Sequence, residues 1–237
     1  MTRRLAGIAA ITVLMGVGLA AAEFWETKPF LMWSDKEAER MITDSPWAQK
    51  LFVVVPSSPQ PEDSGTGRLN TGGGGGGDGG GGGGGGGGGR GGGGGGGGGG
   101  QLRLTITWRS ALPIKQAVVR GGVGLGGVVT SPTQAVLDQK EAYYVITIAG
   151  VPRNYQRQTG TLKASSVLRR DKKPNIEAAD VRVEQDQGNL LLGLFFPRTD
   201  AITIEDKEVE VYTKLGTVEL KKKFKIKDMI FKSQLEM

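Results

Sequence analysis

Alternation of apolar and polar side chains is the strongest pattern in the second half of the chain. Residues 102–108 place apolar side chains at every second position, which predicts a strand with one buried and one solvent-exposed face. Residues 181–185 alternate in the same way, whereas residues 190–196 are apolar on both faces and predict a central strand covered on both sides. Turn-forming residues separate these segments, so we expect antiparallel sheet over residues 143–237.

The last hairpin is the most regular part of this pattern. Between Glu208 and Lys227, apolar side chains share one face of two strands and charged side chains share the other. A tight loop centred on Leu215 and Gly216 predicts the cross-strand pairs Glu210 with Lys221, Glu208 with Lys223 and Asp206 with Lys225. Such pairs contribute about 0.2–1 kcal/mol each, so we interpret the lysines as a charge ladder, with a polyanion-binding face as the alternative. Lys222 falls on the apolar face, where it is expected to extend its amine to solvent at an edge.

Two helix starts are visible in the first quarter of the chain. Ser34 and Glu37 form a capping box, which predicts a helix that ends near Thr43. Ser45 followed by Pro46 predicts a second helix that leads into a short apolar run. Helices this short and this apolar are unstable alone in water, so we expect both to dock on the rest of the protein.

Three of the four tryptophans lie in this front piece, at Trp25, Trp33 and Trp47. If they are exposed, they form an aromatic platform that binds a carbohydrate or a peptide by stacking. If they are buried, they are packing residues, which is the more common use of large aromatic side chains. The exposure of the three side chains separates these two hypotheses.

Residues 1–22 have the pattern of a secretory signal peptide. Arg3 and Arg4 supply the positive start, an uncharged apolar run follows, and Ala20 and Ala22 supply the small residues expected at a cleavage site. The run is shorter than the roughly 20 residues of a membrane span, which favours cleavage over an uncleaved anchor. We therefore expect a protein exported to the periplasm or the extracellular space, with no stable membrane span after cleavage.

A glycine tract divides the remaining chain. Residues 72–100 are glycine except for Asp78 and Arg90, and a segment rich in proline and small polar residues precedes them from residue 56. Glycine loses the most backbone entropy on ordering and has no side chain to bury, so residues 56–100 are predicted to be a disordered linker. The predicted fold is α+β, with a Trp-rich helical segment at residues 23–55, this linker, and a mainly antiparallel β domain at residues 101–237.

Composition excludes several kinds of chemistry. The chain has no cysteine and no histidine, which excludes disulfides, cysteine nucleophiles, Ser-His-Asp triads and the usual zinc and copper sites. The net charge of +6 is mild, and we predict no nucleic-acid partner, because such binding usually needs lysine and arginine clustered on one face. The basic stretch at residues 169–173 is interpreted as a solvated loop. No catalytic, cofactor-binding or metal-binding residues are predicted.

One glycine motif formally matches a nucleotide-binding pattern. Gly122, Gly124 and Gly127 give G-x-G-x-x-G, but a dinucleotide site needs a helix directly after the motif. The next expected helix begins only at Pro132, with Ser131 as its N-cap. We therefore interpret the motif as a mobile loop.

Paired carboxylates are the remaining catalytic candidates. Asp206 and Glu208 are close in sequence, as are Asp180 and Glu184, and two carboxylates can perform glycosidase-like acid and base catalysis. Surface strands and turns explain both pairs better, because nothing in the sequence marks a cleft around them.

Two groups of residues share a pattern on either side of the linker. The first comprises W-x-x-K-P from Trp25 and D-S-P-W-A from Asp44, and the second is W-x-S-A-x-P from Trp108. Together with the stretches at residues 196–198 and 224–229, they resemble an uncharacterised family of exported bacterial proteins of the acidobacterial type. The resemblance implies that the two pieces belong together and that the glycine tract is a variable insertion. It implies no activity and no functional residues.

These observations favour a non-enzymatic protein of the periplasm or envelope, with a structural or interaction role. Its expected partner is an envelope protein or a glycan. A carbohydrate- or peptide-binding module with Trp stacking groups is the first alternative, and a carboxylate-dependent hydrolase is the second.

Overall fold

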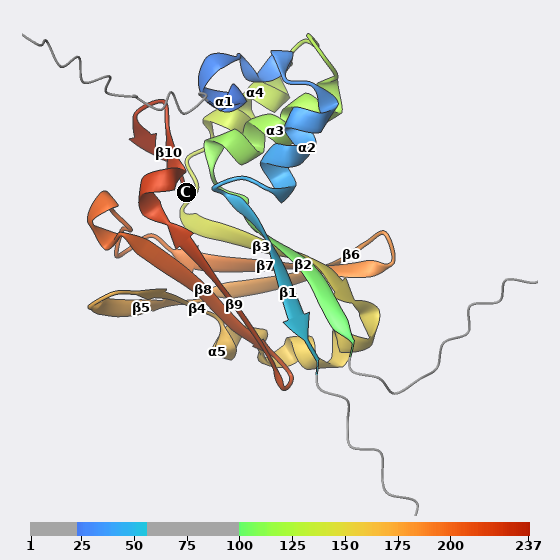
Figure 1. The fold of residues 1–237 in the computed structure, drawn as a ribbon, viewed down its shortest axis with the longest axis vertical. Helices are drawn as coiled ribbons and strands as arrows, with labels where there is room; N and C mark the ends of the chain where they lie inside the picture. The colour runs from blue at the N-terminus through green and yellow to red at the C-terminus, as the bar shows by residue number, and fades with distance from the viewer. Residues whose placement is uncertain (1–22, 56–99) are drawn as a thin grey trace, which may run out of the picture.

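A computed structural model describes residues 23–55 and 100–237 of the chain. Two antiparallel sheets share one apolar core, and a group of short helices lies at one end of them (Figure 1). The predicted α+β class, with antiparallel sheets and short helices, is confirmed. The linker predicted at residues 56–100 falls outside the described residues except for Gly100.

The larger sheet has five strands in the order β1-β2-β3-β7-β6. Their bounds are β1 (Ala48–Val54), β2 (Gln101–Trp108), β3 (Tyr143–Pro152), β7 (Asn189–Pro197) and β6 (Asp180–Asp186). The smaller sheet has the order β5-β4-β8-β9. Its strands are β5 (Lys173–Glu177), β4 (Val167–Arg170), β8 (Glu208–Leu215) and β9 (Val218–Lys225). A small pair near the end of the chain joins β10 (Ile230–Phe231) to β11 (Gln234–Leu235).

The helices fall into two groups. Those at the end of the sheets are α1 (Phe24–Thr27), η1 (Phe30–Met32), α2 (Asp35–Thr43), α3 (Leu112–Val123) and α4 (Ser131–Asp138). The others connect strands of the sheets: η2 (Arg153–Thr161), α5 (Leu162–Ser165), η3 (Ile204–Asp206) and η4 (Ile226–Met229). α3 and α4 form the connection between the neighbouring strands β2 and β3, and this connection packs against the helices of the front piece.

The front piece is built into the larger sheet. β1 pairs with β2 in a continuous antiparallel register, from Ala48 opposite Thr107 to Val54 opposite Gln101. One residue further, the Val55 N–H donates to the Gly100 carbonyl at 2.8 Å. Residues 56–99 therefore connect the two arms of one hairpin, and the front piece shares a core with the rest of the chain.

The first predicted helix is confirmed by α2. Its capping box is complete, because the Glu37 N–H donates to Ser34 Oγ at 3.2 Å and the Ser34 N–H donates to Glu37 Oε2 at 2.8 Å. A buried arginine then holds the start of α2 against α3. Arg120 Nε donates to the Trp33 carbonyl at 2.6 Å, and Arg120 Nη2 donates to Asp35 Oδ1 at 3.0 Å.

The second predicted helix is wrong. Ser45 and Pro46 form a tight turn in which the Ser45 N–H donates to the Ala48 carbonyl at 2.8 Å, and β1 follows at once. As a strand, this segment packs Leu51 and Val53 against the core. The only local signal for a helix is the start predicted at Ser45 and Pro46. Tertiary packing therefore decides the outcome, as it often does in strands.

The basic stretch at residues 169–173 is a loop only in part, because Asp171 and Lys172 form an exposed turn. Arg169 and Arg170 end β4 and Lys173 begins β5, which places Arg170 on the inner face of the smaller sheet. The Arg170 side chain is fully buried and forms an ion pair with Asp200, and its Nη2 also donates to the Pro174 carbonyl at 2.8 Å. A buried arginine needs such partners, and the sequence offered no sign of them.

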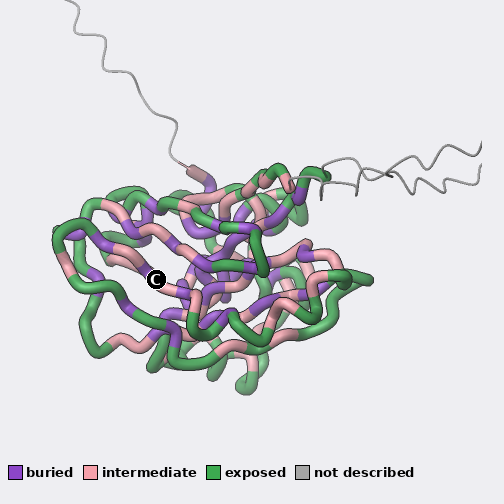
Figure 2. Tube along the Cα trace, turned by 90° about the horizontal axis from the view of Figure 1, so that it is seen from below, coloured by how far each residue is buried: buried purple, intermediate pink, exposed green. Residues whose placement is uncertain are grey.

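The shared core explains why β7 is so apolar. β7 lies between β3 and β6, so its predicted central position is confirmed. One face is buried through Leu190, Leu192, Leu194 and Phe196, while the other face is only half-buried, so cover on both sides was over-predicted. Figure 2 shows the buried segments inside the molecule and the exposed ones around its outline. From β2 of the same sheet, Trp108 lies edge-on to Phe224 of β9 at 5.8 Å between ring centroids, which links the two sheets.

Candidate functional site

The three front-piece tryptophans are packing residues. Trp33 and Trp47 are completely buried, and Trp25 is 6% exposed. The ring centroids of Trp25 and Trp47 lie 6.0 Å apart, and Trp47 lies 6.2 Å from Phe231 in an edge-on arrangement. With their ring faces against other side chains, they offer no platform to a ligand. The prediction that Trp25, Trp33 and Trp47 stack on a carbohydrate or peptide is therefore wrong for this conformation.

The predicted cleavage residues, Ala20 and Ala22, lie outside the described residues. Within residues 23–55 and 100–237, no helix has the length and apolar character needed to cross a membrane.

Ion pairs hold three of the four candidate carboxylates: Asp180 lies 3.4 Å from Arg182 Nε, and the pair of Asp206 and Glu208 is held by lysines. Asp206 is buried and lies 2.8 Å from the Lys173 amine, whereas Glu208 lies 2.6 Å from the Lys223 amine. Burial acts to raise the pKa of Asp206, but Lys173 and the Thr203 N–H outweigh it and lower that pKa. In the described part of the chain, no group of three or more acidic residues could hold a metal ion.

The glycine motif has the layout of a loop between two helices. Gly122 belongs to the last turn of α3, and α4 begins only at Ser131. The Gly126 N–H is used within the protein, where it donates to the Leu31 carbonyl at 2.9 Å. A phosphate would need such N–H groups to be free and a helix N-terminus to follow, so the nucleotide interpretation stays excluded.

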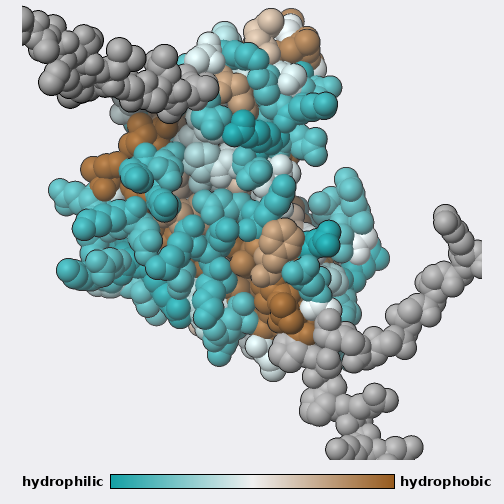
Figure 3. Space-filling model, viewed as in Figure 1, coloured by the Kyte–Doolittle hydropathy of each residue, from teal (hydrophilic) through white to brown (hydrophobic). Residues whose placement is uncertain are grey.

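A charged groove on the outer face of the smaller sheet is the best candidate site. Its volume is about 680 Å³, and we call it the lysine groove. Its lining residues are Arg169, Arg170, Asp171, Ile204, Lys207, Glu208, Glu210, Lys223, Lys225 and Lys227. In Figure 3 the surface over β8 and β9 is strongly hydrophilic, as these residue types require.

Strand pairing builds the floor of the lysine groove. Arg169 of β4 lies opposite Glu210 of β8, which in turn lies opposite Lys223 of β9. In the next row, Glu208 lies opposite Lys225. Residues two apart on a strand share a face, so both rows point to the same side of the sheet.

The predicted charge ladder is only partly present. Gly216, with φ of 64°, is the first residue of a two-residue loop, so the loop centre is one position later than expected. Glu208 therefore lies opposite Lys225 rather than Lys223, and Tyr212 rather than Glu210 lies opposite Lys221. The charged residues keep their common face because this change moves the cross-strand partners by two positions.

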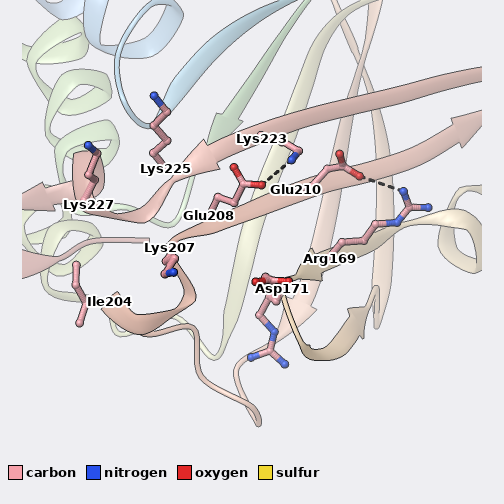
Figure 4. Close-up of a pocket in the computed structure, with 10 residues that line it drawn as sticks. Arg169, Asp171, Ile204, Lys207, Glu208, Glu210, Lys223, Lys225 and Lys227 are labelled. Atoms are coloured by element: carbon pink, nitrogen blue, oxygen red, sulfur yellow. Dashed lines mark hydrogen bonds and ion pairs between the residues drawn. The ribbon is translucent and has the colours of Figure 1, made fainter.

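Two ion pairs cross the floor of the groove. Glu208 Oε1 lies 2.6 Å from Lys223 Nζ on a diagonal, and Glu210 Oε1 lies 3.0 Å from Arg169 Nη1. Figure 4 shows both pairs, with the side chains of Lys225 and Lys227 directed away from them. The hydrogen bond to Glu208 raises the pKa of Lys223, so this lysine stays charged at neutral pH.

Three lysines of the groove have no acidic partner. Among the described residues, Lys207, Lys225 and Lys227 make neither an ion pair nor a side-chain hydrogen bond, and all three are exposed. The Ile226 N–H donates to the Lys207 carbonyl at 2.8 Å, so the backbone of Lys207 lies beside the segment that carries the other two lysines. The sequence showed the lysine stripe but gave no sign that Lys207 joins it.

Lys207 has an uncommon backbone conformation. Its φ is 55° and its ψ is −57°, close to the rare and strained form of the γ-turn. Strain of this kind costs about 1–3 kcal/mol and persists only where the surrounding structure holds it. The turn between η3 and β8 therefore fixes Lys207 at the mouth of the groove.

Lys222 has a structural role. It lies on the inner side of β9, opposite Val211, and its Nζ donates to the Lys50 carbonyl of β1 at 3.0 Å. The predicted position at an edge holds, and the exposed amine also caps an edge of the other sheet.

A second groove lies where the end of the chain meets α3. Its volume is about 530 Å³, and its lining includes Ser110, Lys115, Glu141, Arg198 and Glu236. Lys115 is buried, lies 2.8 Å from Glu141 Oε1 and donates to the Gln139 carbonyl at 2.8 Å. Burial lowers the pKa of Arg198, which donates to the Met237 backbone oxygen. These contacts use the buried charges within the protein, so the lysine groove is the stronger candidate.

Comparisons of the chain with protein-family models, with curated proteins and with solved structures found no match. The function of the chain is therefore inferred from the geometry of the lysine groove.

Proposed function

We propose that this chain is an exported, non-enzymatic protein of the cell envelope, and that it holds an anionic partner in the lysine groove. One observation carries the proposal: Lys207, Lys225 and Lys227 all line the groove, and none has an acidic partner among the described residues. Exposed lysines cluster in this way at a cost, because like charges repel each other. An anionic partner would remove that repulsion.

Export rests on the sequence of residues 1–22, and the absence of cysteine is compatible with any redox compartment. The resemblance to exported bacterial proteins supports the same location. A non-enzymatic role is favoured because Glu208 and Glu210 of the groove are held by ion pairs to Lys223 and Arg169.

Co-sedimentation of the full chain with isolated envelope material tests this function. The variant K207Q/K225Q/K227Q removes the unpaired lysines, and K36Q/R157Q/K163Q removes the same charge from exposed positions outside the groove. We expect the wild type and the second variant to sediment at low salt, and the groove variant to stay in solution. Equal sedimentation of all three proteins would contradict the proposal.

The same assay tests the hydrolase alternative. Release of soluble sugar or peptide fragments from the envelope material, abolished by E208Q, would identify an enzyme in place of a binding protein. We expect no such release.

A further inference from the structure

We propose that the partner of the lysine groove is an acidic polysaccharide, a chain that carries carboxylates and hydroxyls together. This inference rests on the proposed function, because it names the chemistry of the ligand for the same groove. It follows from the charges of the groove side chains, from the polar atoms that have no hydrogen bond within the described residues, and from the lack of aromatic side chains in the lining of the groove.

The free cations define where the acidic groups of the ligand bind. Lys225 and Lys227 are both exposed and lie on either side of Ile226 in the sequence. The carbonyl of Lys207 accepts a hydrogen bond from the Ile226 N–H. The three ammonium groups line one groove and supply several hydrogen-bond donors and no acceptor. They therefore match carboxylate groups that follow one another along a chain.

The groove also offers free acceptors, which a purely anionic ligand could not use. Glu208 and Glu210 each bind a cation through Oε1, and their Oε2 atoms have no hydrogen bond within the described residues. Asp171 also lines the groove and has no ion pair in that part of the chain. Ionised carboxylates accept hydrogen bonds only. A ligand that fills this groove must bring donors beside its negative groups, as sugar hydroxyls do.

Nucleic acids and membranes fit the groove less well. Single-stranded nucleic acid binds by stacking its bases on open aromatic rings. The nearby ring of Tyr212 is covered by the Arg169 guanidinium, which lies 3.6 Å from the ring centroid. DNA phosphates bring no donors for Glu208 and Glu210. A membrane surface would need apolar side chains to insert, and Ile204 is the one large exposed apolar side chain that lines the groove.

Titration of the full chain with polygalacturonate tests the inference. Calorimetry or fluorescence anisotropy at about 20 mM and about 150 mM salt should show binding that weakens with salt, since screening at the higher value acts within about 8 Å. We expect the variant K207Q/K225Q/K227Q to bind about tenfold more weakly or worse, and K36Q/R157Q/K163Q to bind as the wild type does. Unchanged thermal midpoints show that the exposed substitutions leave the fold intact.

Three further probes separate the possible outcomes. Neutral dextran should not bind, and inorganic polyphosphate and a single-stranded oligonucleotide should bind more weakly than polygalacturonate. In E208A/E210A the preference for polygalacturonate over polyphosphate should fall, because the acceptors for hydroxyls are gone. If polyphosphate or the oligonucleotide binds more tightly in the wild type, the polysaccharide assignment is overturned while the groove remains a binding site. If no probe distinguishes the groove variant from its matched control, the assignment is overturned, and the envelope co-sedimentation decides whether the proposed function falls with it.

Discussion

Two hairpins of this protein differ in how their strands are joined and in what they contribute. β8 and β9 are joined by the two residues Gly216 and Thr217 and carry the lysine groove on their outer face. β1 and β2 are joined through residues 56–99, yet they pair without a break and place their inner faces in the core. The second hairpin shows that strand pairing does not require a short connection when both strands bury an apolar face.

The difference follows from the scale of the competing free energies. The entropy of closing a loop grows slowly with its length, by about 0.6 kcal/mol for each doubling. Burial of one Leu or Val side chain contributes about 1.5–3 kcal/mol. Leu51 and Val53 of β1 pack against the core, and Trp47 and Ala48 are completely buried, so packing outweighs the long connection.

The largest effect is expected when the front piece loses its hold on the core. Trp47→Ala removes a fully buried ring that packs against Trp25 and Phe231, together with a 2.7 Å hydrogen bond from its Nε1 to the Glu236 carbonyl. We expect the free energy of unfolding to fall by about 3–5 kcal/mol in a denaturant titration.

Phe52→Ala is the matched control for Trp47→Ala. Phe52 lies in β1, which begins directly after Trp47, but it is 56% exposed, so a loss below about 1 kcal/mol is expected. Similar small losses for both variants would mean that the front piece is not integral to the core.

A smaller effect of opposite sign is expected when the β1–β2 connection is shortened. Replacement of residues 56–99 by Asn-Gly closes the hairpin with a favoured turn beyond Val55 and Gly100. Shortening from roughly 44 residues to about two removes between four and five doublings of length, so stability should rise by about 2 kcal/mol or slightly more. A rise of about 4–8 °C in the thermal midpoint is the corresponding readout. A marked fall would show that the replaced residues contribute structure of their own.

The strained lysine links stability to binding. Lys207→Gly permits the positive φ of 55° without a side-chain clash, but it also adds flexibility to the unfolded chain. We expect a net gain in stability of about 1 kcal/mol and weaker binding of polygalacturonate. A loss of stability would contradict the strain, and unchanged binding would remove Lys207 from the site.

The smallest effect is expected at the ion pairs of the β8–β9 hairpin. Glu208→Gln breaks the surface pair with Lys223, whose side chains are both about half exposed. Exposed pairs contribute about 0.2–1 kcal/mol, so the thermal midpoint should change by no more than a few degrees. A loss of several kcal/mol would mean that this hairpin depends on its charges and not on its buried face.

The same contrast between local and distant contacts explains which elements could be predicted from the sequence. The capping box of Ser34 and Glu37 and the alternating strands depend on neighbours in the chain, and the structure confirms them. The β1 strand was predicted as a helix because its partner lies beyond residues 56–99, where no local pattern could reveal the pairing. The position of the β8–β9 loop was wrong by one residue because the sequence alone does not fix which loop position Gly216 takes.

The candidate site was only partly visible in the sequence. The lysines of β9 formed an evident stripe, and the charge ladder explained part of it. Arg169 forms an ion pair with Glu210, so this glutamate is not available to a lysine of β9. The hydrogen bond from the Ile226 N–H brings Lys207 beside the end of β9. Both are tertiary contacts between segments that are far apart along the chain. The sequence left open whether the three front-piece tryptophans are exposed or buried, and the structure shows that they are buried.

Chemical-shift mapping tests the central claim most directly, because it locates the bound ligand without any substitution. Backbone amide signals of the full chain are followed by NMR while polygalacturonate is added. We predict shifts concentrated at residues 169–171, 204–210 and 223–227, with little change in β1, β2 and the buried tryptophans. Largest shifts at the second groove, around Lys115 and Glu236, or no saturable shifts at all, would contradict the assignment of binding to the lysine groove.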